Sequence, residues 1–269
     1  MPQSRSTKRV SAANEYNRRN IETLEMFYGS GYLSMGGDEE VANIVARVAV
    51  EGKQVLDVGC GLGGAAIALA SQHKAASVQG IDIDAGVLKR AHALVQQAGL
   101  QDRISLTQFE PGPLPLADAA FDLVFLTAVS CHIKDLVPFF AEIKRVTRPG
   151  GCLVGGEWFK HCDNPAYRRW DDLLRERGLN FYFVSCEEFE SALLESGFEQ
   201  VSIANRNSEM TQLTQSYLER GASDLRQTLV ESMGDQGYTH FMEWTRIRAD
   251  GLALGGSGYG HFTAIKRIG

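Results

Sequence analysis

The sequence predicts an α/β fold in which helices cover both faces of a seven-stranded, mostly parallel, doubly wound sheet. Three observations support this prediction. A run of apolar β-formers ends in a glycine-rich turn over 55–64, a second apolar run ends in the acidic residue Asp82, and strand and helix patterns then alternate along the chain. Such alternation places ligands at the carboxyl ends of the strands.

The first half of the chain supplies successive strand and helix units. After the glycine-rich turn, 65–71 is expected to be a short apolar helix and 77–81 a strand. Asp84 is placed to cap a helix that runs to about Gly99, because apolar residues recur there at helical spacing. The remaining expected elements are strands at 103–108, 121–127 and 152–157, and a helix over 134–146.

The second half begins with a helix start signal. Ser185 and Glu188 form an S-x-x-E capping box, and Gly197 is expected to end the helix that this box opens. A strand at 200–204 follows, and the last strand is expected at about 258–266. The residues between these two strands look mainly helical, in three stretches over 209–221, 224–233 and 238–250.

Length and composition favour one domain, 1–269. The 269 residues are 44% hydrophobic, which is enough for one large core, and no Pro/Ser-rich linker divides them. The longest apolar runs are strand-sized, so no membrane span is expected. No apolar segment follows Arg5, Lys8 and Arg9, so a secretory signal is not expected and the cytoplasm is the expected location.

Charge and cysteine content limit the partners. The five cysteines contain no C-x-x-C pair, so neither a disulfide framework nor a metal site is expected. The net charge of −6 comes without a basic run, which argues against nucleic acid as a substrate. We therefore expect a small-molecule substrate, no membrane or nucleic-acid partner, and a monomer or homodimer.

The glycine-rich turn is the strongest ligand signal. Gly59, Gly61 and Gly64 satisfy GxGxxG, which alone is also compatible with a nicotinamide cofactor. Asp82 follows Gly61 by 21 positions, the placement of a carboxylate that accepts from ribose hydroxyls and disfavours a 2′-phosphate. Asp57 lies two residues before Gly59 and is expected to orient the turn.

With the strand over 121–126 and the turn over 148–151, this set resembles the class I S-adenosylmethionine-dependent methyltransferases from about 52 to 159. The resemblance implies a Rossmann-like sheet and S-adenosyl-L-methionine as the cofactor. It implies a late helical region, before the last strand, that forms a lid over the substrate; a packing layer without substrate contact is the alternative. The implied cofactor-binding residues are Asp57, Gly59, Gly61, Gly63, Asp82, Ile83 and, for the adenine amino group, Glu110.

His132 is the candidate general base. It follows the fourth strand, at the sheet edge where cofactor and substrate are expected to meet. Imidazole titrates near neutrality and suits the removal of a proton from a nucleophile. The alternative is a loop histidine with no catalytic role.

A longer resemblance includes both ends of the chain. The segment YNRRNIETLEMFYGSGYLSMGG over 16–37 and the ending GYGHFTAIK over 258–266 look like the phosphoethanolamine methyltransferases, which make phosphocholine by successive N-methylation. In that family an N-terminal helix covers the cofactor, and a tyrosine on it bonds the histidine after the fourth strand. Tyr16, thirteen residues before Gly29, matches that tyrosine, and His132 matches the histidine. Leu33 and Ser34 match cofactor-contacting positions.

Two departures from this family concern the substrate. The aspartate that helps to hold the amine is Ala128 here. The family's phosphate-binding lid residues correspond to Trp158, Arg175, Leu179 and Phe181 here, and its late lysine falls near Arg246 to Arg248. The methyl-transfer residues thus match while the phosphate-binding residues do not, so a different small substrate is expected.

The leading hypothesis is N-methylation of a small amine, including amines that carry a carboxylate, as in the related sarcosine and dimethylglycine enzymes. The alternatives are O-, S- or C-methylation of a small metabolite in an apolar pocket, and a cofactor-binding protein without activity. Within the single domain we expect an N-terminal cofactor cover (1–37), a cofactor-binding core (38–159), a substrate lid with late elements (160–257) and the last strand (258–269).

Overall fold

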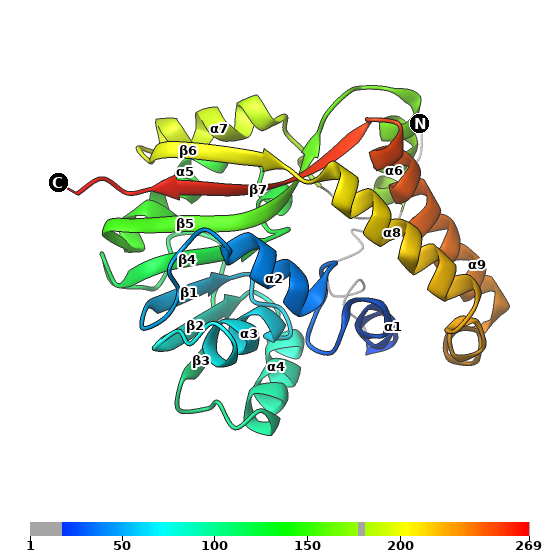
Figure 1. Ribbon diagram of the computed structural model, residues 1–269, viewed down its shortest axis with the longest axis horizontal. Helices are drawn as coiled ribbons and strands as arrows, with labels where there is room; N and C mark the ends of the chain where they lie inside the picture. Colours follow the sequence, from blue (N-terminus) through cyan, green and yellow to red (C-terminus); the bar gives the residue numbers. More distant parts are fainter. Residues whose placement is uncertain (1–17, 177–180, 269) are drawn as a thin grey trace, which may run out of the picture.

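The computed structural model describes residues 18–176 and 181–268, which form one seven-stranded sheet (Figure 1). The strand order is β3-β2-β1-β4-β5-β7-β6, and only β7, which is antiparallel to β5 and β6, departs from the parallel arrangement. The strands are β1 Gln54–Val58, β2 Ser77–Asp82, β3 Ile104–Gln108, β4 Phe121–Thr127, β5 Thr147–Lys160, β6 Glu199–Asn205 and β7 Ser257–Ile265. The predicted fold class is confirmed.

Helices cover both faces of this sheet (Figure 1). Buried residues of α2, α3 and α4 belong to the core of one face, and those of α5 and α7 belong to the core of the other. The helices are α1 Arg18–Tyr28, α2 Gly37–Val45, α3 Gly64–Ser71, α4 Ala85–Gln97, α5 Leu136–Val146, α6 Pro165–Glu176, α7 Cys186–Glu195, α8 Asn207–Ala222 and α9 Arg226–Ala253. A short 3-10 turn, η2, spans Ser130–His132.

The two predicted helix caps are present. The Asp84 carboxylate accepts the N–H groups of Gly86 and Val87 at 2.7 and 2.9 Å and starts α4. At α7, Ser185 and Glu188 form both hydrogen bonds of the capping box. These local signals start two helices, α4 and α7, that lie on opposite faces of the sheet.

The late helical region is a pair of long helices, α8 and α9. The expected gap between 233 and 238 corresponds to a break inside α9 at Gly234, whose φ of +74° is outside the helical range. Two helices were not expected from the sequence, α2 and α6. The N-terminal signal of α6 is nevertheless present, because the Asn164 side chain accepts the N–H of Tyr167 at 2.9 Å and Pro165 occupies the first helical position.

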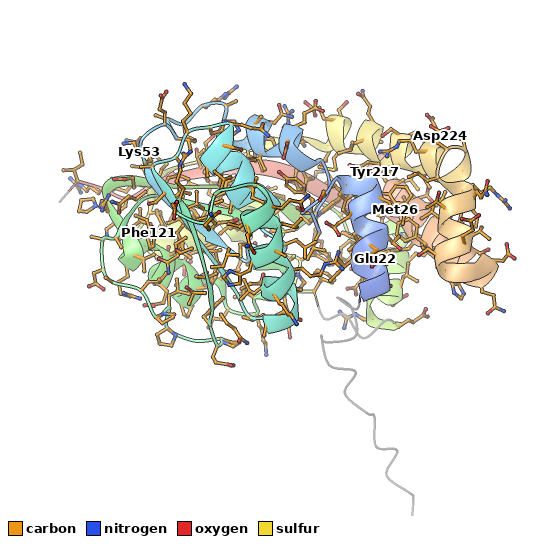
Figure 2. The ribbon with its side chains drawn as sticks, turned by 90° about the horizontal axis from the view of Figure 1, so that it is seen from below. Glu22, Met26, Lys53, Phe121, Tyr217 and Asp224 are labelled. Carbon is orange, nitrogen blue, oxygen red and sulfur yellow. The ribbon has the colours of Figure 1, made fainter. Side chains whose placement is uncertain are left out.

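Helices α1, α8 and α9 lie beyond the carboxyl ends of the parallel strands (Figure 1). Phe27 of α1 packs on Tyr217 of α8 and Phe241 of α9, with ring centroids 5.9 and 4.9 Å apart. Figure 2 shows α1, marked by Glu22 and Met26, between the sheet and this helix pair. None of the described helices is both long and apolar enough to cross a membrane. The division of the chain into cover, core and lid stays a prediction.

Candidate active site

The glycine-rich turn joins β1 to α3 through backbone conformations that side chains disfavour. Gly59, Gly61 and Gly63 have φ values of +66°, +53° and +82°. A Cβ atom at Gly59 would lie 2.5 Å from the side chain of Val129, just before η2. Gly59 therefore leaves room for Val129, and the turn directly abuts the segment that carries His132.

The chain before α2 lies over this turn. The Gly64 N–H, at the start of α3, donates to the Gly31 carbonyl at 3.0 Å. A Cβ atom at Gly61 would lie 3.3 Å from the Leu33 side chain, and Ser34 follows Leu33 in the same half-buried bend. The structure thus brings Leu33 to the glycine-rich turn, as the proposed cofactor contact requires.

Asp57 lies beneath the turn and is 2% exposed. One carboxylate oxygen, Oδ2, is buried without a hydrogen-bond partner among the described residues. Burial, and after it the charge of Asp82, raise the pKa of Asp57 to about 8. Near neutral pH this carboxyl therefore keeps its proton in the absence of a ligand, and a ligand that is cationic or donates hydrogen bonds would favour its ionised form.

Asp82 ends β2 at the same edge of the sheet. Its Oδ2 accepts from the Gly61 N–H and its Oδ1 from the Asp84 N–H, each at 2.9 Å, so each oxygen keeps a further lone pair. Burial raises the pKa of Asp82, and the backbone N–H donors of Asp84, Gly61 and Ile83 oppose that shift. The next residue, Ile83, is an apolar side chain that is 51% exposed, and Glu110 is exposed after β3. This acidic and apolar combination fits a ribose and an adjoining base.

His132 ends the 3-10 turn η2 after β4. The His132 N–H donates to the Val129 carbonyl at 3.0 Å. The side chain is exposed, and its ring centroid lies 4.5 Å from that of Phe181. Partial desolvation lowers the pKa of His132, which keeps the imidazole neutral and able to accept a proton near neutral pH.

Aromatic rings continue from His132 across the lid to β7. Neighbouring centroids along this series lie 4.5–5.6 Å apart, and Phe181 and Phe183 are stacked at 5.3 Å. We call the series the aromatic wall; its members are His132, Phe181, Phe183, Trp170, Trp158 and Tyr259. The Tyr259 hydroxyl bonds Glu40 of α2, which also bonds the Nε2 of His261 at 2.6 Å. The far end of the wall is therefore fixed to the core.

Arg248 of α9 is a buried cation, 7% exposed. One of its amino groups, Nη1, donates to the Tyr28 hydroxyl at 3.0 Å, and its guanidinium lies 5.9 and 5.6 Å from the rings of Tyr28 and Trp244. Within the described ranges it forms no ion pair, and its Nε is buried without a hydrogen-bond partner. Because an unpaired buried charge is unfavourable, this site is suited to an anionic group.

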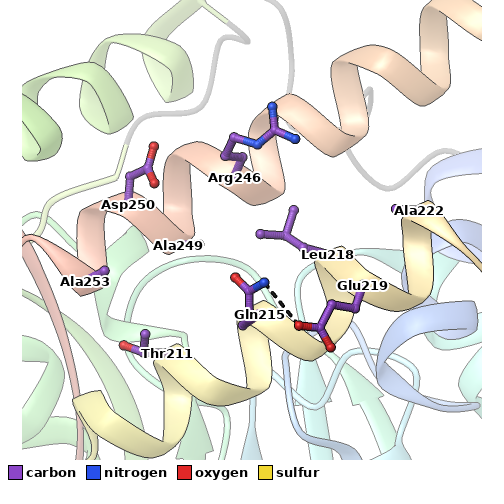
Figure 3. A pocket seen from close by; sticks show the side chains of 9 residues that line it. All are labelled: Thr211, Gln215, Leu218, Glu219, Ala222, Arg246, Ala249, Asp250 and Ala253. Carbon is purple, nitrogen blue, oxygen red and sulfur yellow. Dashed lines mark hydrogen bonds between the residues drawn. The ribbon is translucent and has the colours of Figure 1, made fainter.

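Two other predicted substrate residues lie elsewhere. Arg175 is 64% exposed and pairs with Asp171 on the surface of α6. Arg246 is exposed and lines an open groove between α8 and α9 together with Glu219 and Asp250 (Figure 3). Tyr16 and Leu179 lie outside the described residues. The structure therefore groups Trp158 and Phe181 in the aromatic wall but does not bring Arg175 or Arg246 to it.

One polar residue of this region was missed by the sequence analysis. Glu157 of β5 is 1% exposed, and its carboxylate bonds the turn that carries His132. The sequence did contain a signal for this residue, because Glu157 is the one acidic residue in the otherwise apolar stretch 152–159. A buried carboxylate there needs specific hydrogen-bond donors.

The chain is similar to known methyltransferases. Residues 56–155 match a family described as a methyltransferase domain. Phosphoethanolamine N-methyltransferase 1 from Zea mays is 23% identical over 94% of this chain and 49% of its own length. 24-Methylenesterol C-methyltransferase 2 from Oryza sativa subsp. japonica is 35% identical over 48% of this chain and 36% of its own length.

A solved structure shares the fold over nearly the whole chain. Phosphoethanolamine N-methyltransferase 2 from Haemonchus contortus, in complex with phosphomonomethylethanolamine and S-adenosylhomocysteine, superposes with a TM-score of 0.85 at 21% identity. The match covers 94% of this chain and 59% of that chain. This chain thus spans about half the length, or less, of the curated relatives named above.

The chain therefore contains a methyltransferase domain on a Rossmann-like, seven-stranded sheet, as predicted from the sequence. Among methyltransferases, the chain resembles the phosphoethanolamine N-methyltransferases along almost its entire length. A second structure of phosphoethanolamine N-methyltransferase 2 from Haemonchus contortus is in complex with S-adenosyl-L-methionine, which agrees with the predicted cofactor.

Proposed function

We propose that this chain transfers a methyl group from S-adenosyl-L-methionine to a small amine that carries one carboxylate. The proposed methyl transfer is supported by the residues at one edge of the sheet. They are the glycine-rich turn, Asp57 with its unpartnered Oδ2, and the Asp82–Ile83 pair. These residues fit the parts of the cofactor: acceptors for a cationic group and for ribose hydroxyls, and an exposed apolar side chain for adenine.

Each residue of this edge has a proposed role toward the cofactor. When bound, S-adenosyl-L-methionine supplies a methyl group on a positively charged sulfur, which a lone pair of the acceptor displaces in line. Asp82 accepts from the ribose hydroxyls, Ile83 packs on the adenine and Glu110 accepts from its amino group. Leu33 and Ser34 close the chamber from above, since Leu33 already approaches Gly61. Excluding water in this way strengthens the polar contacts inside.

His132 supports the chemical step by accepting the proton that the amine loses. Its lowered pKa keeps one ring nitrogen unprotonated at neutral pH. The ring nitrogen would take the proton that the amine loses, while bound S-adenosyl-L-methionine would supply the methyl group and its sulfur would keep the electron pair of the carbon–sulfur bond. We further propose that Tyr16, which lies outside the described residues, acts together with His132 in turnover.

The acceptor class is inferred from the buried cation and the aromatic wall. Arg248 offers one cationic partner, whereas Phe181 offers no hydrogen-bond donor at a position where the resemblance to the related family implies a phosphate-binding side chain. One guanidinium matches one carboxylate well, and a phosphate dianion needs several converging donors. The faces of Trp158 and Phe181 also suit an amine, because aromatic rings attract cationic groups.

The second candidate function is C- or O-methylation of an apolar small molecule. The aromatic wall favours it, as does the sterol C-methyltransferase relative, which is 35% identical over 134 residues. A cytoplasmic location, a single domain and a monomeric or homodimeric state remain part of the proposal.

A labelled-methyl experiment tests the proposed function. The chain is incubated with S-adenosyl-L-methionine labelled in its methyl group and with a small-metabolite extract, and products are located by mass spectrometry. We expect label on the nitrogen of a carboxylate-bearing amine. Label on carbon or oxygen would support the second candidate, and cofactor binding without any labelled product would support a non-catalytic binding protein. A His132→Ala variant run in parallel shows whether transfer depends on the proposed base.

A further inference from the structure

Glu157 places a fully buried carboxylate directly beneath η2. The Ser130 N–H donates to its Oε2 at 2.8 Å, and the Ser130 hydroxyl donates to the same oxygen. The Trp158 N–H donates to its Oε1 at 2.8 Å, and the Cys131 side chain also bonds this carboxylate. Several donors therefore converge on one side chain that is 1% exposed.

These bonds join β5 to the turn that presents His132. On the same stretch of β5, the Gly156 carbonyl accepts from the Ala128 N–H at 3.0 Å, so β5 holds the segment at both Ala128 and Ser130. Ala128 has a φ of +52°, a conformation that a non-glycine residue keeps only when its surroundings impose it. Hydrogen bonds from β5 therefore hold this turn in its conformation, which its own sequence does not favour.

The same turn also anchors the lid. The Tyr182 N–H donates to the Cys131 carbonyl at 2.7 Å, and the preceding residue, Phe181, packs on the His132 ring. The orientation of His132 and the start of the aromatic wall both depend on where Ser130 and Cys131 lie. Glu157 bonds both of those residues.

We propose that Glu157 is a positioning residue, whose carboxylate fixes η2 so that the His132 ring faces the methyl acceptor. This inference rests on the proposed function, in which His132 accepts the acceptor's proton. A carboxylate is required because it accepts hydrogen bonds at both oxygens, while glutamine would turn an N–H₂ group toward Ser130 or Trp158. Burial raises the pKa of Glu157, and its donors oppose that shift.

The decisive experiment compares Glu157→Gln in the wild type and in the His132→Ala background, with Glu187→Gln as a matched control on the exposed first turn of α7. Labelled methyl transfer gives kcat and the KM of the acceptor, and calorimetry gives the Kd of S-adenosyl-L-methionine. We expect Glu157→Gln to lower kcat about ten- to a hundredfold, because small misplacements of a reacting group are costly. The cofactor Kd should change by less than about twofold, and the effect should largely disappear in the His132→Ala background.

Two outcomes would overturn the inference. One is an equal loss of kcat in both backgrounds; the other is a cofactor Kd that weakens as much as kcat falls in a variant that keeps its folded structure. If Glu157→Gln does not fold, Ser130→Ala removes one donor of the same contact and takes its place. A wild type that transfers no methyl group would instead contradict the proposed function.

A second measurement needs no methyl acceptor. The His132 ring is titrated by NMR in the wild-type chain and in Glu157→Gln. Because loosening η2 would separate the ring from Phe181 and reduce its partial desolvation, the pKa of His132 should rise toward the ordinary value for histidine. An unchanged His132 titration would contradict a positioning role whether or not the chain transfers methyl groups.

Discussion

Asp82 is the residue whose contacts tie the glycine-rich turn to β2. Its two oxygens already hold the N–H groups of Gly61 and Asp84, and the proposed ribose contacts use the remaining lone pairs. We predict that Asp82→Ala weakens S-adenosyl-L-methionine binding about tenfold or more, since hydrogen bonds to a charged group contribute roughly 1.5–3 kcal/mol. Titration calorimetry measures this, with the exposed Asp102→Ala as control. Equal affinity in the wild type and in Asp82→Ala would remove Asp82 from the site.

The pKa of His132 predicts the pH dependence of turnover. Desolvation lowers this pKa, so the ring loses its proton at a lower pH than an ordinary histidine does. We therefore expect kcat to rise with pH, with a midpoint below the ordinary histidine value, and to be flat at neutral pH. A pH profile of kcat checks this. A midpoint above the ordinary value, or the same profile in His132→Ala, would show that another group controls the rate.

Individual residues also show which contacts can be predicted from the sequence and which cannot. The capping side chains Asp84 and Ser185 act on N–H groups two or three residues away, so their roles are visible locally. Glu157 bonds a turn 27 residues away in the sequence, and that pairing depends on the strand neighbours β4 and β5. Contacts of this kind arise from the sheet order, which no local pattern encodes.

At the scale of elements, α9 separates two arginines that the sequence could not distinguish. Residues two positions apart on a helix point in nearly opposite directions, so Arg248 is buried against Tyr28 while Arg246 faces the α8–α9 groove. We predict that Arg248→Met raises the KM of the acceptor about ten- to a hundredfold and that Arg246→Met changes it little. Steady-state kinetics with both variants checks this. Equal effects of the two substitutions would contradict the assignment of Arg248.

The N-terminal segment is the second element with a testable role. Helix α1 packs on α8 and α9, and Tyr16 lies just before the described residues. If Tyr16 and His132 act as a unit, the combined Tyr16→Phe and His132→Ala variant should lose clearly less activity than the product of the single effects. Single-turnover rates of the three variants decide this. Independent multiplication of the two effects would leave two residues with separate roles.

At the scale of the whole molecule, the fold is shared with solved methyltransferases, whereas a different substrate region is part of our proposal. Its sheet order and nearly complete superposition on the Haemonchus contortus enzyme show the fold, which by itself does not specify the acceptor. The fold was predictable because the strand and helix patterns alternate and the glycine-rich turn marks the ligand edge. The acceptor was less predictable, because the aromatic wall is assembled in three dimensions from η2, β5, α6, the segment before α7, and β7.

A substrate panel tests the central claim most directly. Phosphoethanolamine, ethanolamine, glycine, sarcosine, dimethylglycine and aromatic amines are compared by kcat/KM with the same supply of S-adenosyl-L-methionine. We expect an amine that carries a carboxylate to be the best acceptor and phosphoethanolamine to be methylated poorly or not at all. If phosphoethanolamine has the highest kcat/KM, the proposed acceptor class is wrong and the activity of the phosphoethanolamine methyltransferases extends to this chain.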